Sequence, residues 1–166
     1  PAVFAQITAA PFHALTATLS ARCDAQSIHG TYCSPRVSTL SKFAQQWALR
    51  LSAGGGIFAP TPFTEETEPI ALSSLQPLNG LRVERARNAS ADLTATFGPL
   101  ELSTTVYGSR VERAVMLRPV AGDTTGKLEL VNSTGPTDAL GAEAFAVYDR
   151  APFVATVHYA YVHSSE

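Results

Sequence analysis

The amino-acid sequence predicts a mainly β fold, a single-domain antiparallel β-sandwich of jelly-roll type. From Leu81 onward, short segments alternate in polarity and are separated by Gly and Pro turn signals. The last segment, 151–163, is apolar at both sets of alternating positions, which is typical of a strand covered on both sides. A chain of 166 residues can bury one substantial core, so we expect one domain over residues 1–166.

The first part of the chain predicts one strand and one short helix. Residues 12–20 alternate in polarity and predict a half-buried strand. A helix is predicted near residues 39–51, capped by Ser38 or Thr39 and ended by Gly54–Gly56. Its apolar residues recur at helical spacing: Leu40, Phe43, Ala44, Trp47, Ala48 and Leu51. Residues 46–52 also alternate as a strand would, so the second half of this helix stays open.

The remainder of the chain predicts a long loop followed by strands. Residues 53–69 contain three Gly, three Pro and an acidic cluster, Glu65, Glu66 and Glu68, which is typical of a solvated surface excursion. The predicted strands after this loop are 81–85, 93–97, 100–106, 111–117 and 128–131. With the N-terminal strands and the last one they number about eight, as in a jelly roll.

The chain carries unusually little charge. Charged residues are 16% of the sequence, against about 25% in typical soluble proteins, and the net charge is −2. A surface with so few charges is normally covered by subunit contacts, glycans, or many Ser and Thr. The near-neutral balance gives no general attraction for nucleic acid or anionic membranes. No run of 18 apolar residues exists, so no membrane span is expected.

Two cysteines and two asparagines suggest a secreted glycoprotein as an alternative. Cys23 and Cys33 flank a short polar segment and would close a disulfide loop in an oxidising compartment, but would be ordinary thiols in the cytosol. Asn88 and Asn132 each begin an N-glycosylation sequon. Both features bear on function only if the chain enters a secretory pathway.

No motif with recognisable chemistry is present, so we expect neither an enzyme nor a metal or cofactor site. The chain lacks a nucleophile elbow, a phosphate-binding loop and a dinucleotide fingerprint. His158 and His163 are five residues apart and would face opposite sides of one strand.

One charged segment could contact RNA weakly. Its arginines are Arg82, Arg85, Arg87, Arg110, Arg113 and Arg118, and they form a candidate basic patch. The favoured interpretation of these residues is paired charges on solvated strand faces.

Two segments resemble coat proteins of icosahedral RNA viruses of the tymovirus type. Val37–Phe43 is similar to the segment that opens their first helix, and Ala151–Ser164 is similar to their final strand. Together they cover a small part of the chain. The resemblance implies a jelly-roll structural subunit that has no active site and assembles through its flanks.

We therefore expect a non-enzymatic viral capsid protein that self-associates into a homo-oligomeric virion. The alternative is a secreted, N-glycosylated β-sandwich binding module or effector, stapled by a Cys23–Cys33 disulfide.

Overall fold

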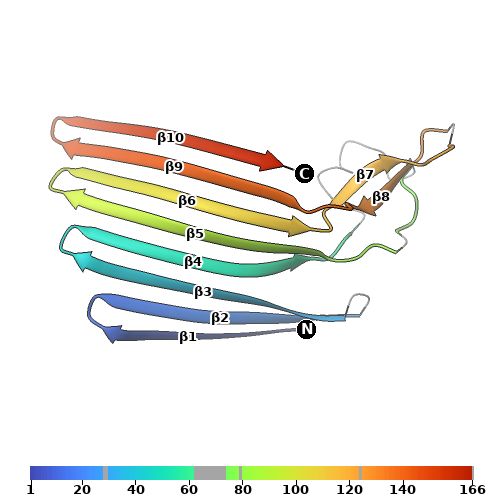
Figure 1. Ribbon diagram of the computed structural model, residues 1–166, viewed down its shortest axis with the longest axis horizontal. Coiled ribbons are helices and arrows are strands. Elements are labelled where there is room, and N and C mark those ends of the chain that lie inside the picture. The colour runs from blue at the N-terminus through green and yellow to red at the C-terminus, as the bar shows by residue number, and fades with distance from the viewer. Residues whose placement is uncertain (28–29, 62–73, 79, 124, 166) are drawn as a thin grey trace.

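A computed structural model describes residues 1–27, 30–61, 74–78, 80–123 and 125–165. The chain is mainly β, as predicted, and its strands pair antiparallel. One sheet has eight strands in the order β1-β2-β3-β4-β5-β6-β9-β10, and β7 and β8 form a separate hairpin (Figure 1). The strands are β1 (Ala2–Phe12), β2 (Leu15–Gln26), β3 (Gly30–Ala44), β4 (Trp47–Phe58), β5 (Glu84–Phe97), β6 (Leu100–Glu112), β7 (Val115–Pro119), β8 (Leu128–Asn132), β9 (Thr137–Arg150) and β10 (Phe153–Ser165).

The sheet is a meander with two different ends. At one end, which we call the turn end, short turns join β1 to β2, β3 to β4, β5 to β6 and β9 to β10 (Figure 1). Gly98 has a φ of 57° in the β5–β6 turn, a conformation that favours glycine. At the opposite end, the loop end, the connections are longer and include the β7–β8 hairpin.

The register divides the side chains of the sheet between an apolar face and a polar face. Leu49, Leu93, Thr104, Ala144 and Tyr159 lie opposite one another in a row across five strands. Because successive side chains point to opposite sides, the adjacent row lies on the other face. That row is polar: Arg50, Asp92, Thr105, Glu143 and Ala160.

The described part of the chain is a single layer rather than a sandwich. The substantial contacts between strands are all between hydrogen-bonded neighbours. The buried apolar side chains there are Val83, Ala95, Val115 and Leu130, of which two lie on the small hairpin. Val3 is 72% exposed and Val157 is 67% exposed. The expected jelly-roll packing is therefore not found, because no second sheet formed by the described residues covers the first.

The short helix predicted near residues 39–51 is wrong. This segment contains the end of β3, a turn at Gln45 and Gln46, and the start of β4. Trp47, Leu49 and Leu51 alternate with polar residues, and pairing with β5 places all three on the apolar face. The helical spacing of the apolar residues combined positions from two strands.

In the described ranges, no helix is long and apolar enough to cross a membrane.

Two further expectations change. The predicted loop 53–69 is strand as far as Phe58, and its acidic cluster Glu65, Glu66 and Glu68 lies outside the described residues. The final segment was expected in the middle of a sheet, but β10 is an edge strand with every residue exposed. Its valines on both sides of the strand, such as Val154 and Val157, are not covered by the described residues.

A tyrosine ring takes the place of a missing side chain on the polar face. Tyr107 and Gly141 are opposite each other on β6 and β9. A Cβ added to Gly141 would overlap the end of the Tyr107 ring. The ring therefore covers the glycine, a pairing that compensates for the weak strand preference of glycine.

We expect Gly141→Ala to lower the free energy of unfolding by about 1 kcal/mol, because the added methyl displaces this ring. Denaturant titration measures the change. Gly108→Ala is the matched control, since a Cβ there would lie 3.6 Å from Leu140 Cδ1, an ordinary contact. In a Tyr107→Ala background the Gly141→Ala change should cost little, and an unchanged cost would contradict this explanation.

Candidate functional site: the two faces of the sheet

The apolar face carries an uncharged band of constant width on three neighbouring strands. It runs from Ala89 to Phe97 on β5, Leu100 to Gly108 on β6 and Leu140 to Tyr148 on β9, nine residues on each strand. The carboxylates inside these ranges lie on the polar face, as the row of Asp92 and Glu143 shows. A strand needs about 9–11 residues to cross the hydrocarbon of a bilayer when tilted by about 45°.

Charged and aromatic side chains mark the two edges of this band. At the loop end, Arg87, Arg110 and Asp138 lie opposite one another on the apolar face. At the turn end the same face carries aromatic residues, Trp47, Phe97, Tyr148 and Phe153. The Trp47 and Phe97 rings meet edge to face at 5.7 Å. An apolar band with an aromatic edge matches the boundary between hydrocarbon and headgroups, where aromatic rings concentrate.

On the polar face, hydroxyl and charged groups lie on the same stretch of the strands as the apolar band. The Thr105 hydroxyl donates to Asp92 Oδ1 at 2.9 Å. His158 Nε2 lies 3.9 Å from Glu143 Oε2, and the His158 ring meets Phe145 edge to face at 6.1 Å. A hollow of about 360 Å³ on this face is lined by Leu40, Lys42, Ala48, Arg50, Asp92, Thr94 and Ser103. These groups suit contact with water or a polar ligand.

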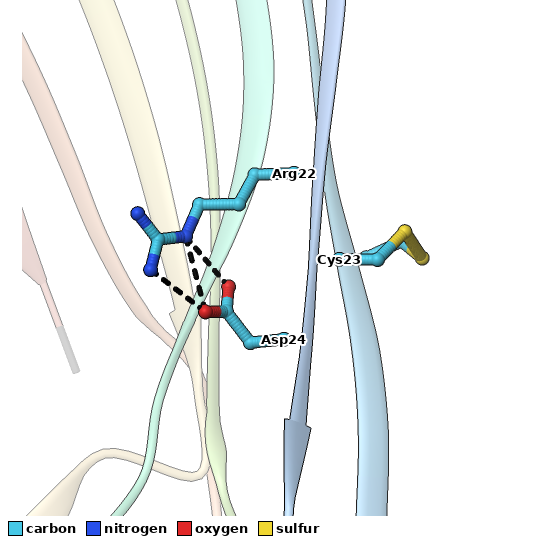
Figure 2. Close-up of a disulfide and its surroundings, with 4 residues drawn as sticks. Arg22, Cys23 and Asp24 are labelled. Carbon is cyan, nitrogen blue, oxygen red and sulfur yellow. Dashed lines mark hydrogen bonds and ion pairs between the residues drawn. A yellow bond between two sulfur atoms is a disulfide. The ribbon is translucent and has the colours of Figure 1, made fainter. Parts of the chain in front are cut away.

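A disulfide joins Cys23 on β2 to Cys33 on β3 near the loop end (Figure 2). The two cysteines are directly opposite each other in the register, on the apolar face. Arg22 and Asp24 flank Cys23 and extend from the other side of β2 (Figure 2). Arg22 donates three hydrogen bonds of 2.8–3.1 Å to the Asp24 carboxylate.

The six arginines of the candidate basic patch all lie toward the loop end, but several are engaged. Arg110 donates to both Asp138 carboxylate oxygens at 2.7 Å. Arg118 donates to Glu129 Oε1 across the β7–β8 hairpin. The backbone carbonyls of Arg82 and Arg113 accept hydrogen bonds from Asn132, which leaves the charges of the two guanidinium groups unchanged. Arg85 and Arg87 are exposed on the apolar face, and Arg87 lies 3.7 Å from the Glu112 carboxylate.

The two sequon asparagines have different surroundings. Asn88 is exposed on the polar face of β5, opposite Gly54. Asn132 holds the hairpin to the sheet: its Nδ2 donates to two carbonyls at 2.8 and 2.9 Å, and its Oδ1 accepts from the Arg82 N–H at 2.7 Å. A glycan on Nδ2 would remove one of these donors.

The loop of the hairpin is closed by Asp123. Its carboxylate accepts from the Lys127 backbone N–H at 2.7 Å and from the Thr125 hydroxyl at 2.8 Å. These hydrogen bonds favour the ionised form and hold the pKa of Asp123 below its usual value.

Within the described ranges, no cluster of three or more His, Cys, Asp or Glu could hold a metal ion. His158 faces the polar side and His163 the apolar side, which agrees with their odd spacing. His29 lies outside the described residues.

The fold resembles parts of larger transport proteins. No family model and no curated protein matches the sequence. The chain superposes on the siderophore receptor PirA from Pseudomonas aeruginosa with a TM-score of 0.87 and 16% identity, covering 99% of this chain and 34% of that one. It matches the FrpB iron transporter from Neisseria meningitidis with a TM-score of 0.76 and 15% identity, covering 98% and 25%. It also matches the copper transporter OprC with a TM-score of 0.71 and 14% identity, covering 97% and 28%.

These similarities correct the expected function. The capsid and virion interpretation is wrong, because the matching structures are receptors and transporters and the single sheet is not a jelly-roll sandwich. The expected self-association into a homo-oligomeric coat is wrong for the same reason. The matching structures do not support a secreted location either. The expectation of no membrane span is not supported either. It considered only runs of 18 apolar residues, whereas a strand can cross with alternate apolar positions.

Removing the disulfide tests the role of Cys23 and Cys33. We expect the Cys23→Ser/Cys33→Ser variant to lose about 2–4 kcal/mol of unfolding free energy, because the bond restricts the unfolded chain over a sequence separation of 10. Denaturant titration with and without reductant gives the comparison. The variant should be insensitive to reductant. Equal stability of variant and wild type in the absence of reductant would contradict the prediction.

Proposed function

We propose that this chain is one sector of a β-barrel that crosses the bacterial outer membrane and takes up metal-carrying ligands. The single observation that carries the proposal is the uncharged, nine-residue band on one face of a one-layer sheet. The fold shared with a siderophore receptor and with iron and copper transporters supports the ligand class.

Lipid would provide the cover that the apolar face lacks. Val106 is 50% exposed, Leu140 63% and Val157 67%, and all three point from this face. Each such side chain gains about 1.5–3 kcal/mol when it is fully removed from water. Acyl chains can cover the whole face without a second sheet.

The two unpaired edges of the sheet indicate that further strands complete it. β1 and β10 each have one neighbour, so half of their backbone N–H and C=O groups point away from the sheet. In hydrocarbon every such group must be paired, and closure into a barrel achieves this. The matching structures are much longer than this chain, which covers 34% of PirA and 25% of FrpB.

In this arrangement the polar face lines the interior of the barrel. Arg50, Asp92, Glu143 and His158 would face water or the passing ligand. The turn end corresponds to the periplasmic side, because outer-membrane barrels have short periplasmic turns and longer extracellular loops. The β7–β8 hairpin then lies outside the cell, where it can contact an arriving ligand.

The single tryptophan of the chain offers a direct test of membrane contact. Trp47 lies at the aromatic edge of the band, so its fluorescence should be quenched more by lipids brominated near the headgroup than by lipids brominated at the chain end. Steady-state fluorescence in vesicles of the two lipids makes the comparison. Quenching by neither lipid would overturn the proposal.

A matched pair of charge insertions tests which face meets lipid. Leu93 and Thr94 are adjacent in the middle of β5, on the apolar and polar faces respectively. Leu93→Arg should destabilise the protein folded in vesicles and lower its free energy of unfolding by about 2–4 kcal/mol. Thr94→Arg should lower the free energy of unfolding much less. Urea titration in vesicles measures both. Equal costs would contradict the assignment of the faces.

A further inference from the structure

A hollow of about 690 Å³ lies at the loop end of the sheet, over β3, β4 and β5. The glycine run Gly54–Gly56 of β4 forms much of its floor. A Cβ on Gly55 would meet Ala86 O at 3.6 Å and Pro35 Cδ at 3.9 Å, so the position accepts a side chain but has none. The missing side chains therefore leave a depression over β4, between β3 and β5.

Two arginines border this hollow. Arg85 and Arg87 occupy successive apolar-face positions of β5, and both are lining residues of the hollow. Arg87 lies 3.7 Å from Glu112, with its side chain 70% exposed. Glu112 is on β6, on the opposite side of the arginines from β4. After this carboxylate is counted, one positive charge remains, and both guanidinium groups keep donors available toward the hollow.

The next charge along the same row is already neutralised. Arg110 lies opposite Arg87 on β6, but its guanidinium is held by Asp138 through two hydrogen bonds of 2.7 Å. On the apolar face of the sheet, the available positive charge is therefore located at Arg85 and Arg87, beside the hollow.

The position of the hollow relative to the apolar band indicates its occupant. Arg87 lies one same-face position beyond Ala89, the residue at the loop-end edge of the band on β5, about 7 Å along the strand. Side chains at this level lie beside the phosphates of a bilayer whose acyl chains cover the band. Arginine binds phosphate through two parallel N–H···O bonds, which a lysine cannot form.

We propose that Arg85, Arg87 and the Gly54–Gly56 hollow bind the phosphate group of an anionic membrane lipid. The acyl chains of this lipid would lie along the apolar face at Leu51, Ala53 and Ala89, which adjoin the hollow. This site rests on the proposed function, because it requires the apolar band to lie in a membrane. It adds a specific lipid position on the outer surface of the barrel, separate from the ligand path on the polar face.

Lipid selectivity in detergent tests the site. Native mass spectrometry would compare binding of phosphatidylglycerol and phosphatidylcholine with identical acyl chains. We expect wild type to prefer phosphatidylglycerol, and Arg85→Gln/Arg87→Gln to weaken its binding roughly tenfold. Arg36→Gln is the matched control: Arg36 lies opposite Gly54, level with the hollow but on the polar face, and its loss should leave binding unchanged.

A second variant and a competitor keep the result interpretable. Arg85→Lys/Arg87→Lys retains the charge but loses the planar fork, so its affinity should fall between those of wild type and the glutamine variant. Inorganic phosphate at millimolar concentration should not displace the lipid. Displacement would indicate a site for free phosphate and overturn the assignment to lipid.

The remaining outcomes separate the two proposals. Equal binding of both lipids, or equal effects of the Arg85/Arg87 and Arg36 variants, would overturn the headgroup site. If Trp47 were still quenched by brominated lipid, the barrel proposal would stand. Absence of that quenching in wild type would overturn both.

Discussion

Backbone hydrogen bonding between neighbouring strands is the interaction on which this structure depends. Most folds of this length also hold their sheets together by packing a second layer over them. Here the substantial contacts among described strands follow the hydrogen-bonded ladder, and few apolar side chains are buried. The meander order pairs strands that are consecutive in the chain throughout the eight-stranded sheet, except that β6 pairs with β9 across the β7–β8 hairpin.

In a single-layer sheet, the two faces can be exposed to different environments. Leu93 and Asp92 are consecutive in β5, yet one belongs to a row of apolar side chains and the other to a row with Arg50 and Glu143. In a sandwich such a polar face would meet water and the apolar face would meet protein. Because the described residues form no second layer, the proposed bilayer on one side and aqueous interior on the other would satisfy both faces. The function proposed for the chain follows from this asymmetry.

The low charge of the chain agrees with the proposed lipid contact. A band that faces lipid excludes Asp, Glu, Lys and Arg from half of the positions in each crossing strand. The charges that remain lie on the polar face or beyond the band, as Asp92, Arg87 and Asp138 do. Low charge was interpreted from the sequence as burial in a protein assembly. It also fits burial in lipid, and composition alone does not distinguish the two.

The sequence by itself determined the strand character of most of the chain, because β-branched residues, alternation and Gly or Pro turns act locally. It also contained the alternation of segments such as 89–97, which defines the two faces once the strands are paired. The pairing register of the strands decided which side chains share a face. Leu40 and Leu51 share a helical spacing in the sequence, but pairing places Leu40 with Arg50 on the polar face and Leu51 with Thr39 on the apolar face. The gathering of Arg85, Arg87 and the glycine run beside the band likewise depends on which residues of β4 and β5 are opposite each other. Whether an apolar face is covered by protein or by lipid depends on the presence of a second layer, and only the tertiary structure shows that the described strands lack one.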